Sequence, residues 1–385
     1  MYILTIGRAF PEKRTGMIGI FEFEQAAALA AHDGDKVIYA ISDNRSIKVV
    51  RSLKKIRKTV QGVEVYGRQL PIRGLPHKLF DLIRAKEMKK LLKQIIDEQG
   101  VPDVIHVHFP LLTLNHSIVD YIRTLGCKLV ITEHWSKVQK QELPAWRIAL
   151  LKYCVANSDA FICVSGLLRD SVLALTKSEK HIDVVPNMVS ADFHYAPAKK
   201  TDADAFTFIA VGRLVELKRF PVVIKAFAKA FQGERSVRLE IVGDGNQRKE
   251  LDALIKTLRI GDQAKMLGFQ KREDVAKLYT GADCYVSASI LETFGVPFIE
   301  AWVTGLPCIG VQGGPVDQYF SPQNGLLFEG DNVDSLAEAM RQIYQNRSAY
   351  NRKQISETAS AIFTADRVAG RLRTIFTDCI QADNK

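Results

Sequence analysis

Two glutamates at the start of a short predicted helix are the first residues in the sequence that could do chemistry. Pro297 suits the first turn of a helix and Gly305 suits its end, so we predict a helix over residues 296–304. Glu292 precedes this helix, and Glu300 lies about one turn inside it. The free N–H groups and the dipole at a helix N-terminus favour a phosphate, and two carboxylates beside it can accept hydrogen bonds from sugar hydroxyls. From the spacing alone, a helix start with ordinary surface glutamates is an equal alternative.

Two basic residues follow a predicted buried strand over residues 206–211. Arg213 and Lys218 come just before a predicted helix over residues 221–231, which places them at the carboxyl end of the strand. Parallel sheets bind ligands at that end, and two cations there can neutralise a diphosphate. The alternative is a solvated loop, but the position at a strand end favours binding.

Two glycines, Gly16 and Gly19, separate the first predicted strand from the first predicted helix. Glycine here lets a ligand approach the backbone closely. Loop flexibility is a strong alternative, because the spacing is not the G-x-G-x-x-G of a dinucleotide fold. Two D-x-D strings, at residues 33–35 and 202–204, fall in a predicted turn and a predicted linker, so we predict no metal site at either.

Three histidines could form a metal site with nitrogen ligands. His106 and His108 share one face of a predicted strand, and His134 follows the next strand directly. Hydrogen-bonded histidines buried in strands are commoner, and no carboxylate lies at ligand spacing, so we predict no metal. His134 lies at a strand's carboxyl end, where a functional side chain is expected, and is a candidate to hydrogen-bond a sugar.

Short apolar runs alternate with amphipathic stretches along the chain, which is typical of parallel sheets covered by helices on both faces. We therefore predict an α/β protein of two doubly wound domains, with a cleft between the carboxyl ends of their strands. The predicted strands span residues 2–6, 36–41, 63–66, 104–109, 128–132, 161–164 and 182–185, then 206–211, 238–242, 265–267, 284–287 and 308–310. The predicted parts are an N-terminal domain over 1–195, a linker over 196–205, a C-terminal domain over 206–360 and, over 361–385, a C-terminal helix that packs back on the first domain.

Length and composition exclude several classes of protein. The 385 residues suit two domains of about 150 residues, and 47% hydrophobic with 25% charged residues excludes a disordered, collagen-like or coiled-coil chain. No apolar run reaches the ~18 residues of a membrane span, and the first ten residues do not form a signal peptide, so we expect a cytoplasmic protein. The six scattered cysteines are interpreted as buried hydrophobic residues in a reducing compartment.

The stretch around the two glutamates resembles the family 4 retaining glycosyltransferases, with its Glu-x7-Glu pair, its Phe-Gly and its trailing Gly-x-Pro. The resemblance covers nearly the whole chain. Its other segments are GMIGIF at 16–21, DVIHVH at 103–108, TEH at 132–134, VGRL at 211–214, VGDG at 242–245 and NGLLF at 324–328. It implies the GT-B fold, with two facing Rossmann-like domains and an inter-domain cleft. It also implies a metal-independent, retaining transfer from a nucleotide-diphosphate sugar, without a cofactor.

The resemblance also implies roles for individual residues. Arg213 and Lys218 are expected to stabilise the leaving diphosphate. Glu292 is expected to orient the donor sugar, Glu300 the ribose, and His134 to hydrogen-bond the transferred sugar. The acceptor hydroxyl is expected to attack from the same face and to pass its proton to a phosphate oxygen, because no carboxylate in these motifs is placed as a nucleophile. The predicted donor-binding residues are Gly16, Gly19, Arg213, Lys218, Gly243, Glu292, Thr293, Phe294, Gly295, Val296 and Glu300.

We therefore expect transfer of a hexose-type sugar from a UDP or GDP donor to a polysaccharide or lipid-linked acceptor, in bacterial surface-glycan synthesis. A nucleotide-sugar 2-epimerase of the same fold is one alternative, which a donor-only assay would identify. A nucleic-acid-binding protein is another, suggested by the net charge of +10. However, residues 45–58 contain no aromatic residue that could stack on bases, so we predict no nucleic-acid partner.

The basic excess lies entirely in the first half of the chain. Residues 1–200 hold 30 Lys and Arg against 20 Asp and Glu, whereas residues 201–385 hold 23 of each kind. We predict that the basic 45–93 segment docks on an anionic membrane, which would place the protein peripherally on the inner face of the plasma membrane. Apolar residues at helical spacing over 79–96 are most simply core of the first domain.

Overall fold

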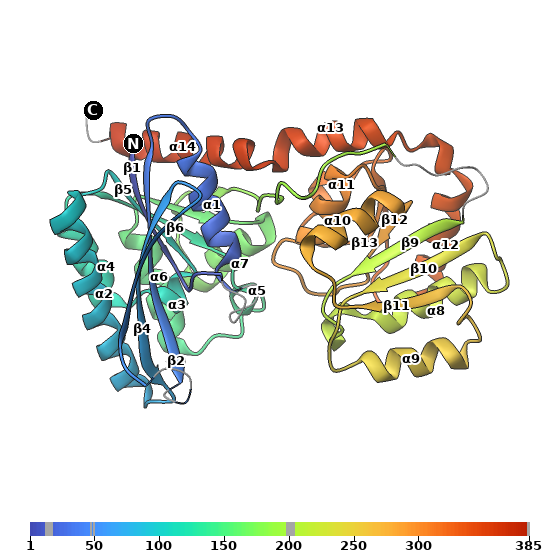
Figure 1. Ribbon diagram of the computed structural model, residues 1–385, viewed down its shortest axis with the longest axis horizontal. Helices are drawn as coiled ribbons and strands as arrows, with labels where there is room; N and C mark the ends of the chain where they lie inside the picture. The colour runs from blue at the N-terminus through green and yellow to red at the C-terminus, as the bar shows by residue number, and fades with distance from the viewer. Residues whose placement is uncertain (12–17, 47, 49–50, 198–204, 383–385) are drawn as a thin grey trace. The chain divides into compact units, whose positions relative to one another are not determined.

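The chain, described by a computed structural model, forms two compact units (Figure 1). The structure describes residues 1–11, 18–46, 48, 51–197 and 205–382. Unit 1 consists of Met1–Asn187 and Ala365–Lys385, and unit 2 consists of Met188–Thr364.

Unit 1 is an α/β unit. Its strands are β1 (Tyr2–Gly7), β2 (Lys36–Ser46), β3 (Lys54–Val60), β4 (Val63–Arg73), β5 (Val104–His108), β6 (Lys128–Glu133), β7 (Ala160–Cys163) and β8 (Asp183–Val184). Its helices are α1 (Ile20–Ala30), α2 (His77–Gln99), α3 (Pro110–Thr113), α4 (His116–Arg123), α5 (Ser136–Gln139), α6 (Ala145–Asn157), α7 (Gly166–Thr176) and α14 (Ala365–Gln381). The strand order is β3-β4-β2-β1-β5-β6-β7-β8, in which β3 is antiparallel to β4 and the other neighbours pair in parallel. Strands β5 and β7 are buried along their whole length, as expected of parallel strands covered on both faces.

Unit 2 is a second α/β unit with a parallel sheet, as predicted. Its strands are β9 (Phe206–Val211), β10 (Val237–Val242), β11 (Ala264–Gly268), β12 (Cys284–Val286), β13 (Cys308–Val311) and β14 (Gly325–Phe328). Its helices are α8 (Phe220–Phe231), α9 (Arg248–Thr257), α10 (Arg272–Gly281), α11 (Val296–Val303), α12 (Val333–Gln345) and α13 (Arg352–Phe363), with short 3₁₀ turns η1 (Glu216–Lys218), η2 (Asp317–Tyr319) and η3 (Arg347–Ala349). The strand order is β11-β10-β9-β12-β13-β14.

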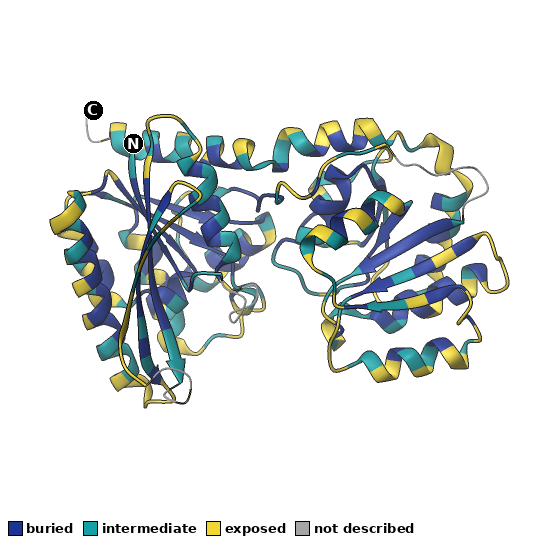
Figure 2. Ribbon diagram, in the orientation of Figure 1, coloured by how far each residue is buried: buried dark blue, intermediate teal, exposed yellow. Residues whose placement is uncertain are grey.

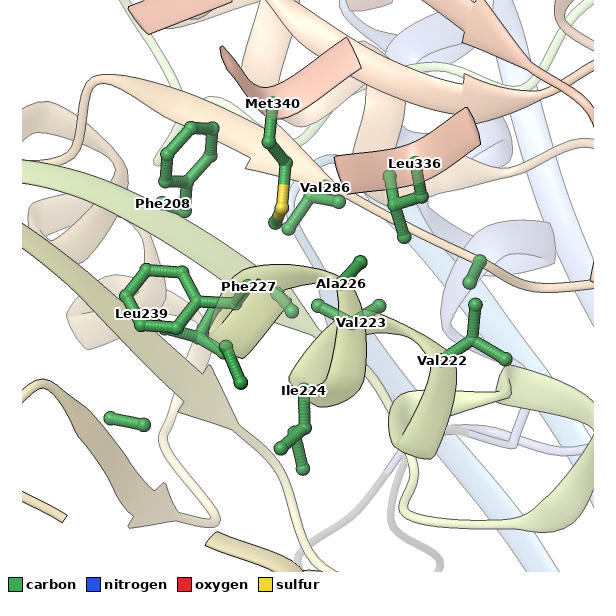
Figure 3. Close-up of a cluster of buried hydrophobic side chains, with 14 of the residues drawn as sticks. Phe208, Val222, Val223, Ile224, Ala226, Phe227, Leu239, Val286, Leu336 and Met340 are labelled. Carbon is green, nitrogen blue, oxygen red and sulfur yellow. The ribbon is translucent and has the colours of Figure 1, made fainter. Parts of the chain in front are cut away.

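The core of unit 2 lies where α8 and α12 pack together against the sheet. Phe208 of β9, Phe227 of α8 and Met340 of α12 are fully buried and come together there (Figure 3). Burying a side chain of this size contributes roughly 2 kcal/mol. This packing anchors the strands whose carboxyl ends carry the predicted donor residues.

Strand β3 was not expected from the sequence. Its residues KKIRKTV carry four charges, yet they pair antiparallel with β4 over seven residues. A charged strand suits the edge of a sheet, because lysines discourage pairing with a further strand. The basic segment is therefore partly an edge strand.

The apolar residues of α2 bear out the prediction of a core helix. Met88, Leu91 and Leu92 are buried, and α2 packs on β2 and β4 (Figure 2). At the start of the helix, however, the side chains of Leu79 and Leu82 are 44% and 67% exposed. Within the described residues, no helix is both long and apolar enough to cross a membrane.

The division between the units falls at Asn187, earlier than the boundary expected at residue 195. Val189 and Phe193 already belong to unit 2, because the Val189 N–H donates to the Phe363 carbonyl and the Phe193 ring lies 5.8 Å from that of Tyr279.

Helix α14 belongs to unit 1. Arg373 donates from Nε to Asp35 at 2.6 Å, and the Phe376 ring lies 5.2 Å from that of His106. Five of the six cysteines are buried and Cys379, on α14, is half-buried; all are free thiols.

Candidate active site

The first candidate group lies in unit 2, in the loop between β9 and α8. Lys218 is the last residue of η1, and its Nζ forms an ion pair with Oε1 of Glu292. The two side chains are 20% and 19% exposed. Arg213 lies earlier in the loop, is exposed, and has no ion-pair partner among the residues that the structure describes. The structure thus joins two predicted catalytic residues and leaves a guanidinium in the same loop open to a ligand.

Gly243 allows two strand ends of unit 2 to approach closely. It follows β10 with φ at +140°, and its N–H donates to the carbonyl of Gly268 at 2.8 Å. A Cβ at this position would lie 1.8 Å from the carbonyl oxygen of Gly212, which follows β9. Only glycine fits here, at the sheet edge that also carries Arg213.

The variant Gly243→Ala is expected to lower the free energy of unfolding of unit 2 by about 2 kcal/mol more than Gly233→Ala. Alanine is strained at both positions, since φ is +140° at Gly243 and +85° at Gly233. A Cβ at Gly233 meets no atom within 4 Å, whereas at Gly243 it collides with the Gly212 oxygen. Urea unfolding measures the difference, and equal losses in the two variants would contradict the close approach.

The helix that follows Glu292 begins with a left-handed glycine. Gly295 is the N-cap of α11 with φ at +95°, and no described side chain caps the first turn. Pro297 lies in that turn, as predicted. Free N–H groups at such an end, together with the helix dipole, attract a negatively charged group. The predicted donor residues Thr293 and Val296 are half-buried beside it.

Phe294 and Glu300 are more buried than the other predicted donor residues. Phe294 is 1% exposed, and its ring lies 6.4 Å from that of Tyr319 and 6.2 Å from that of Phe363. Its side chain therefore packs in the core of unit 2, and its part in donor binding stays a prediction. Glu300 is 9% exposed on α11.

The second candidate group lies in unit 1, at the carboxyl ends of β5 and β6. His108 Nδ1 and His134 Nε2 are 2.9 Å apart, and His106 Nε2 lies 2.7 Å from Oγ1 of Thr132. Burial lowers the pKa of His106 and His134 to about 3 and that of His108 well below its ordinary value. All three imidazoles are therefore neutral near pH 7.

Glu133 is the last residue of β6 and directly precedes His134. Its Oε1 accepts hydrogen bonds from the backbone N–H groups of His134 and Trp135, each at 2.8 Å. The side chain is fully buried, and this burial raises the pKa of Glu133 to about 7. Glu133 therefore holds a proton far closer to neutral pH than an ordinary glutamate does.

Arg8 follows β1 and reaches the same histidines through an aromatic ring. Its Nε donates to Glu22 at 2.6 Å, and its Cζ lies 3.4 Å from the centre of the Phe109 ring. That ring stacks on His134 with centres 4.7 Å apart. The quadrupole of an aromatic ring attracts a cation above its face, so the contact with Phe109 helps to fix the position of the Arg8 guanidinium.

The histidines form no metal site in the described part of the chain. No group of three His, Cys, Asp or Glu side chains there could hold a metal ion. His106 and His108 instead use ring nitrogens for Thr132 and His134. Of the two D-x-D strings, Asp35 pairs with Arg373 and the N-terminal amine, and residues 202–204 lie outside the described residues.

Of the two predicted glycines of unit 1, Gly19 begins the first helix. Gly19 is the N-cap of α1 with φ at +87°, and a Cβ there would lie 2.0 Å from the carbonyl oxygen of Ala9. Gly19 is therefore required for this close approach. Gly16 lies outside the residues that the structure describes.

Arg8, Phe109 and Glu133 are candidate functional residues that the sequence analysis did not single out. Arg8 follows a buried strand as Arg213 does, so the signal that identified Arg213 could have identified it. Glu133 lies within the Thr-Glu-His motif. Phe109 carries no comparable signal, because an aromatic residue after an apolar run is also typical of a core.

Two family models match this chain. Residues 23–193 match the model described as Glycosyltransferase Family 4, and residues 194–361 match the model described as Glycosyl transferases group 1. The first model lies mostly in unit 1 and the second in unit 2.

Curated relatives and solved structures agree with these matches. The phosphatidylinositol N-acetylglucosaminyltransferase GPI3 subunit of Saccharomyces cerevisiae is 24% identical over 286 residues, which are 71% of this chain and 63% of that protein. The chain thus spans less than two thirds of the length of this relative. The N-acetyl-alpha-D-glucosaminyl L-malate synthase of Bacillus anthracis is 25% identical over 345 residues, which are 86% of this chain and 87% of that one. The structure of the Anabaena HepE protein in complex with UDP is 17% identical, covers 98% of this chain and 100% of its own, and has a TM-score of 0.72.

Proposed function

This chain belongs to glycosyltransferase family 4 and has the GT-B fold, and from this premise we propose that it transfers a hexose-type sugar from a UDP-sugar to an acceptor hydroxyl. The observation that carries the proposal is the Lys218–Glu292 ion pair beside an exposed Arg213, at the carboxyl end of β9. UDP is favoured over GDP because HepE was solved with UDP. N-acetylglucosamine, which the names of two relatives contain, is the first sugar to test.

In the proposed reaction, Arg213 and Lys218 stabilise the negative charge that develops on the leaving diphosphate. Preorganised charges of this kind are usually the largest single term in catalysis. Glu292 holds the ammonium group of Lys218 and orients the donor sugar. The N–H groups at the start of α11, after Gly295, add further stabilisation of the phosphate. Glu300 and Gly243 complete the donor side in unit 2.

The acceptor hydroxyl attacks from the face that the diphosphate leaves, so the anomeric configuration is retained. The bond from the anomeric carbon to the diphosphate oxygen breaks, the glycosidic bond forms, and the acceptor proton passes to a phosphate oxygen. This route is supported by the placement of the two glutamates: Glu292 is paired with Lys218, and Glu300 is buried on α11. His134, which is neutral, hydrogen-bonds the sugar without adding charge.

Relatives of this chain differ in the acceptor that their names contain. One relative's name contains phosphatidylinositol and another's contains L-malate, so acceptors differ within this set of relatives. We propose a polysaccharide or lipid-linked acceptor in bacterial surface-glycan synthesis. The basic 45–93 segment of unit 1 favours the lipid-linked kind.

Incubation with a panel of UDP-, GDP- and ADP-sugars is expected to give transfer from a UDP-sugar, and the activity is expected to persist in excess EDTA. Mass spectrometry of the products with and without an acceptor mixture measures transfer and donor epimerisation separately. Stabilisation by UDP at 100 times its dissociation constant should reach about 2.7 kcal/mol. Loss of activity in EDTA that a divalent ion restores would contradict the metal-free mechanism. An epimer of the donor sugar formed without acceptor would instead show that the protein is an epimerase.

We propose that the basic 45–93 segment holds unit 1 on an anionic membrane. Several of its charges are paired, since Arg45 contacts Asp43, Arg57 contacts Glu98, Lys90 contacts Glu87 and Lys93 contacts Asp97. Lys54 and Lys55 are exposed on β3 and have no ion-pair partner within the described residues. These two lysines, with the exposed Leu79 and Leu82, best support the proposal.

The double variant Lys54→Glu/Lys55→Glu is expected to bind phosphatidylglycerol vesicles at least about tenfold more weakly at low salt, because each basic residue near such a surface contributes roughly 1 kcal/mol. Co-sedimentation at low and high salt measures the binding. The control Lys265→Glu/Lys271→Glu makes the same charge change on exposed residues of unit 2. If the wild type did not bind vesicles at low salt, or if the control variant lost as much binding, the membrane proposal would be wrong.

A further inference from the structure

A cavity of about 170 Å³ lies in unit 1, at the carboxyl ends of three neighbouring parallel strands. Gly7 ends β1, Ser42–Arg45 belong to the last part of β2, and Arg73 ends β4. Helix α2 adds Arg84 and Met88. Doubly wound sheets bind ligands at this edge. The volume is that of about five or six water molecules, which suits one oxyanion and a few attached atoms.

Four arginines line this arginine cavity: Arg8, Arg45, Arg73 and Arg84. Arg8 is fixed through Nε, which donates to Glu22 at 2.6 Å, and through its contact with the Phe109 ring. Its terminal nitrogens have no acceptor among the described residues. A guanidinium fixed in this way presents its terminal N–H groups as a planar fork, which matches a carboxylate or a phosphate.

Arg45 and Arg73 add further donors of the same kind. Arg45 Nε lies 2.7 Å from Asp43, and its terminal nitrogens have no acceptor in the part of the chain that is described. Arg73 is exposed and, within the same residues, has no ion-pair partner. Among the described residues, the carboxylates that contact the lining arginines are Asp43, Glu22 and Asp81. Counted over the residues that the structure describes, four cations thus meet three carboxylates, which leaves one positive charge in excess.

Arg84 is the deepest of the four, at 5% exposed. Its Nη1 donates to the Leu112 carbonyl at 2.6 Å, and its Nη2 donates to Asp81 and to the Leu114 carbonyl, each at 2.9 Å. Its Nε is buried and has no hydrogen-bond partner. Because this Nε is enclosed by protein and the terminal nitrogens are already engaged, Arg84 offers a ligand positive charge and no free donor.

We infer that the arginine cavity binds an oxyanion, a carboxylate or a phosphate, carried by the acceptor. The oxyanion follows from the four lining arginines, and its assignment to the acceptor rests on the proposed function. Arg8 lies on Phe109, which in turn stacks on His134, so one aromatic ring separates the cavity lining from the histidine proposed to contact the sugar. The apolar side chains of Ile18 and Leu112 also line the cavity and suit the carbon atoms beside the anion.

Calorimetric titration of the full chain with glycerol 3-phosphate, glycerate and uncharged glycerol tests the inference. At least one of the two anions is expected to bind and glycerol is not. Monomeric dihexanoyl phosphatidylglycerol, compared with dihexanoylglycerol, tests a lipid headgroup as the source of the oxyanion. The variant Arg73→Gln is expected to weaken anion binding about tenfold or more and to leave UDP binding unchanged. The control Arg371→Gln, on an exposed residue of α14 outside the cavity lining, is expected to change neither.

Binding of glycerol and the anions with equal affinity, or anion binding unaffected by both Arg73→Gln and Arg45→Gln, would overturn the inference. So would a failure of every anion to bind. Binding of the short-chain lipid alone supports the inference and assigns the oxyanion to a headgroup. Oxyanion binding without any sugar transfer would contradict the proposed function only, whereas transfer without oxyanion binding would contradict this inference only.

Discussion

Arg213→Ala and Lys218→Ala are each expected to lower the rate of sugar transfer about 100-fold or more while the fold is retained. Removing one strong electrostatic donor from a reacting centre typically has this effect. Arg213 is exposed, and Lys218 is about one-fifth exposed, so neither substitution opens a cavity in the core. Steady-state transfer assays with the best UDP-sugar measure the loss, and circular dichroism and thermal unfolding verify the fold.

A matched control and a double variant separate catalysis from folding. Lys225→Ala removes an exposed lysine of α8, a few residues further along the chain, and is expected to leave transfer unchanged. Because Lys218 and Glu292 are in contact, Lys218→Ala/Glu292→Gln is expected to lose less than the two single losses combined. Near-normal transfer in both the Arg213 and the Lys218 variants would refute the assignment of the site.

Both sheets could be predicted because their central parallel strands are short and mostly apolar. Strands such as β5 and β9 are buried nearly throughout, and this leaves a plain signal in the sequence. Strand β3 could not be predicted in the same way. Four charged residues obscure the alternation of apolar and polar residues that is typical of a strand. The segment is a strand because seven of its residues in succession pair with β4. Pairing of that kind is a property of the fold, which the segment alone does not carry.

Site residues could be predicted from the sequence where they directly follow a predicted strand. Arg213 and His134 each come at the end of an apolar run, and both lie at the carboxyl edge of a sheet. The contact of Lys218 with Glu292 joins residues 74 positions apart, and only the packing of two loops produces it. Likewise, the burial of Phe294 depends on Phe363 of α13, which no local pattern indicates.

Lowering the pH from 7 to 5 is expected to lower the free energy of unfolding of unit 1 by about 2 kcal/mol or more. His106 and His134 have a pKa of about 3 in the folded protein, against an ordinary value of 6.5. As the pH falls, the unfolded chain therefore takes up protons first, and the stability is lost between pH 6.5 and pH 3. Each of the two histidines accounts for a loss of about 2 kcal/mol between pH 7 and pH 5, and the opposing effect of Glu133 offsets about 2 kcal/mol of the sum. The pKa of His108 is also lowered, and this acts in the same direction.

The titration of Glu133 affects stability in the opposite direction to that of the histidines. Replacing Glu133 therefore tests the assigned pKa values of all these groups. Its pKa is about 7 in the folded protein against an ordinary 4.5, so the folded state takes up this proton first. Between pH 7 and pH 5 this uptake adds about 2 kcal/mol of stability. Glu133→Gln keeps an acceptor for the His134 and Trp135 N–H groups but removes the titration, so its loss over the same range should reach about 4 kcal/mol.

Amide hydrogen exchange in β5 and β6, corrected for the pH dependence of the intrinsic rate, measures the free energy of opening at each pH. The wild type and Glu133→Gln are compared at pH 7 and pH 5. If the variant lost no more stability than the wild type, Glu133 would have to be ionised in the folded protein at neutral pH. If the wild type were equally stable at both pH values, the buried histidines could not be neutral, and the role given to a neutral His134 would have to be abandoned.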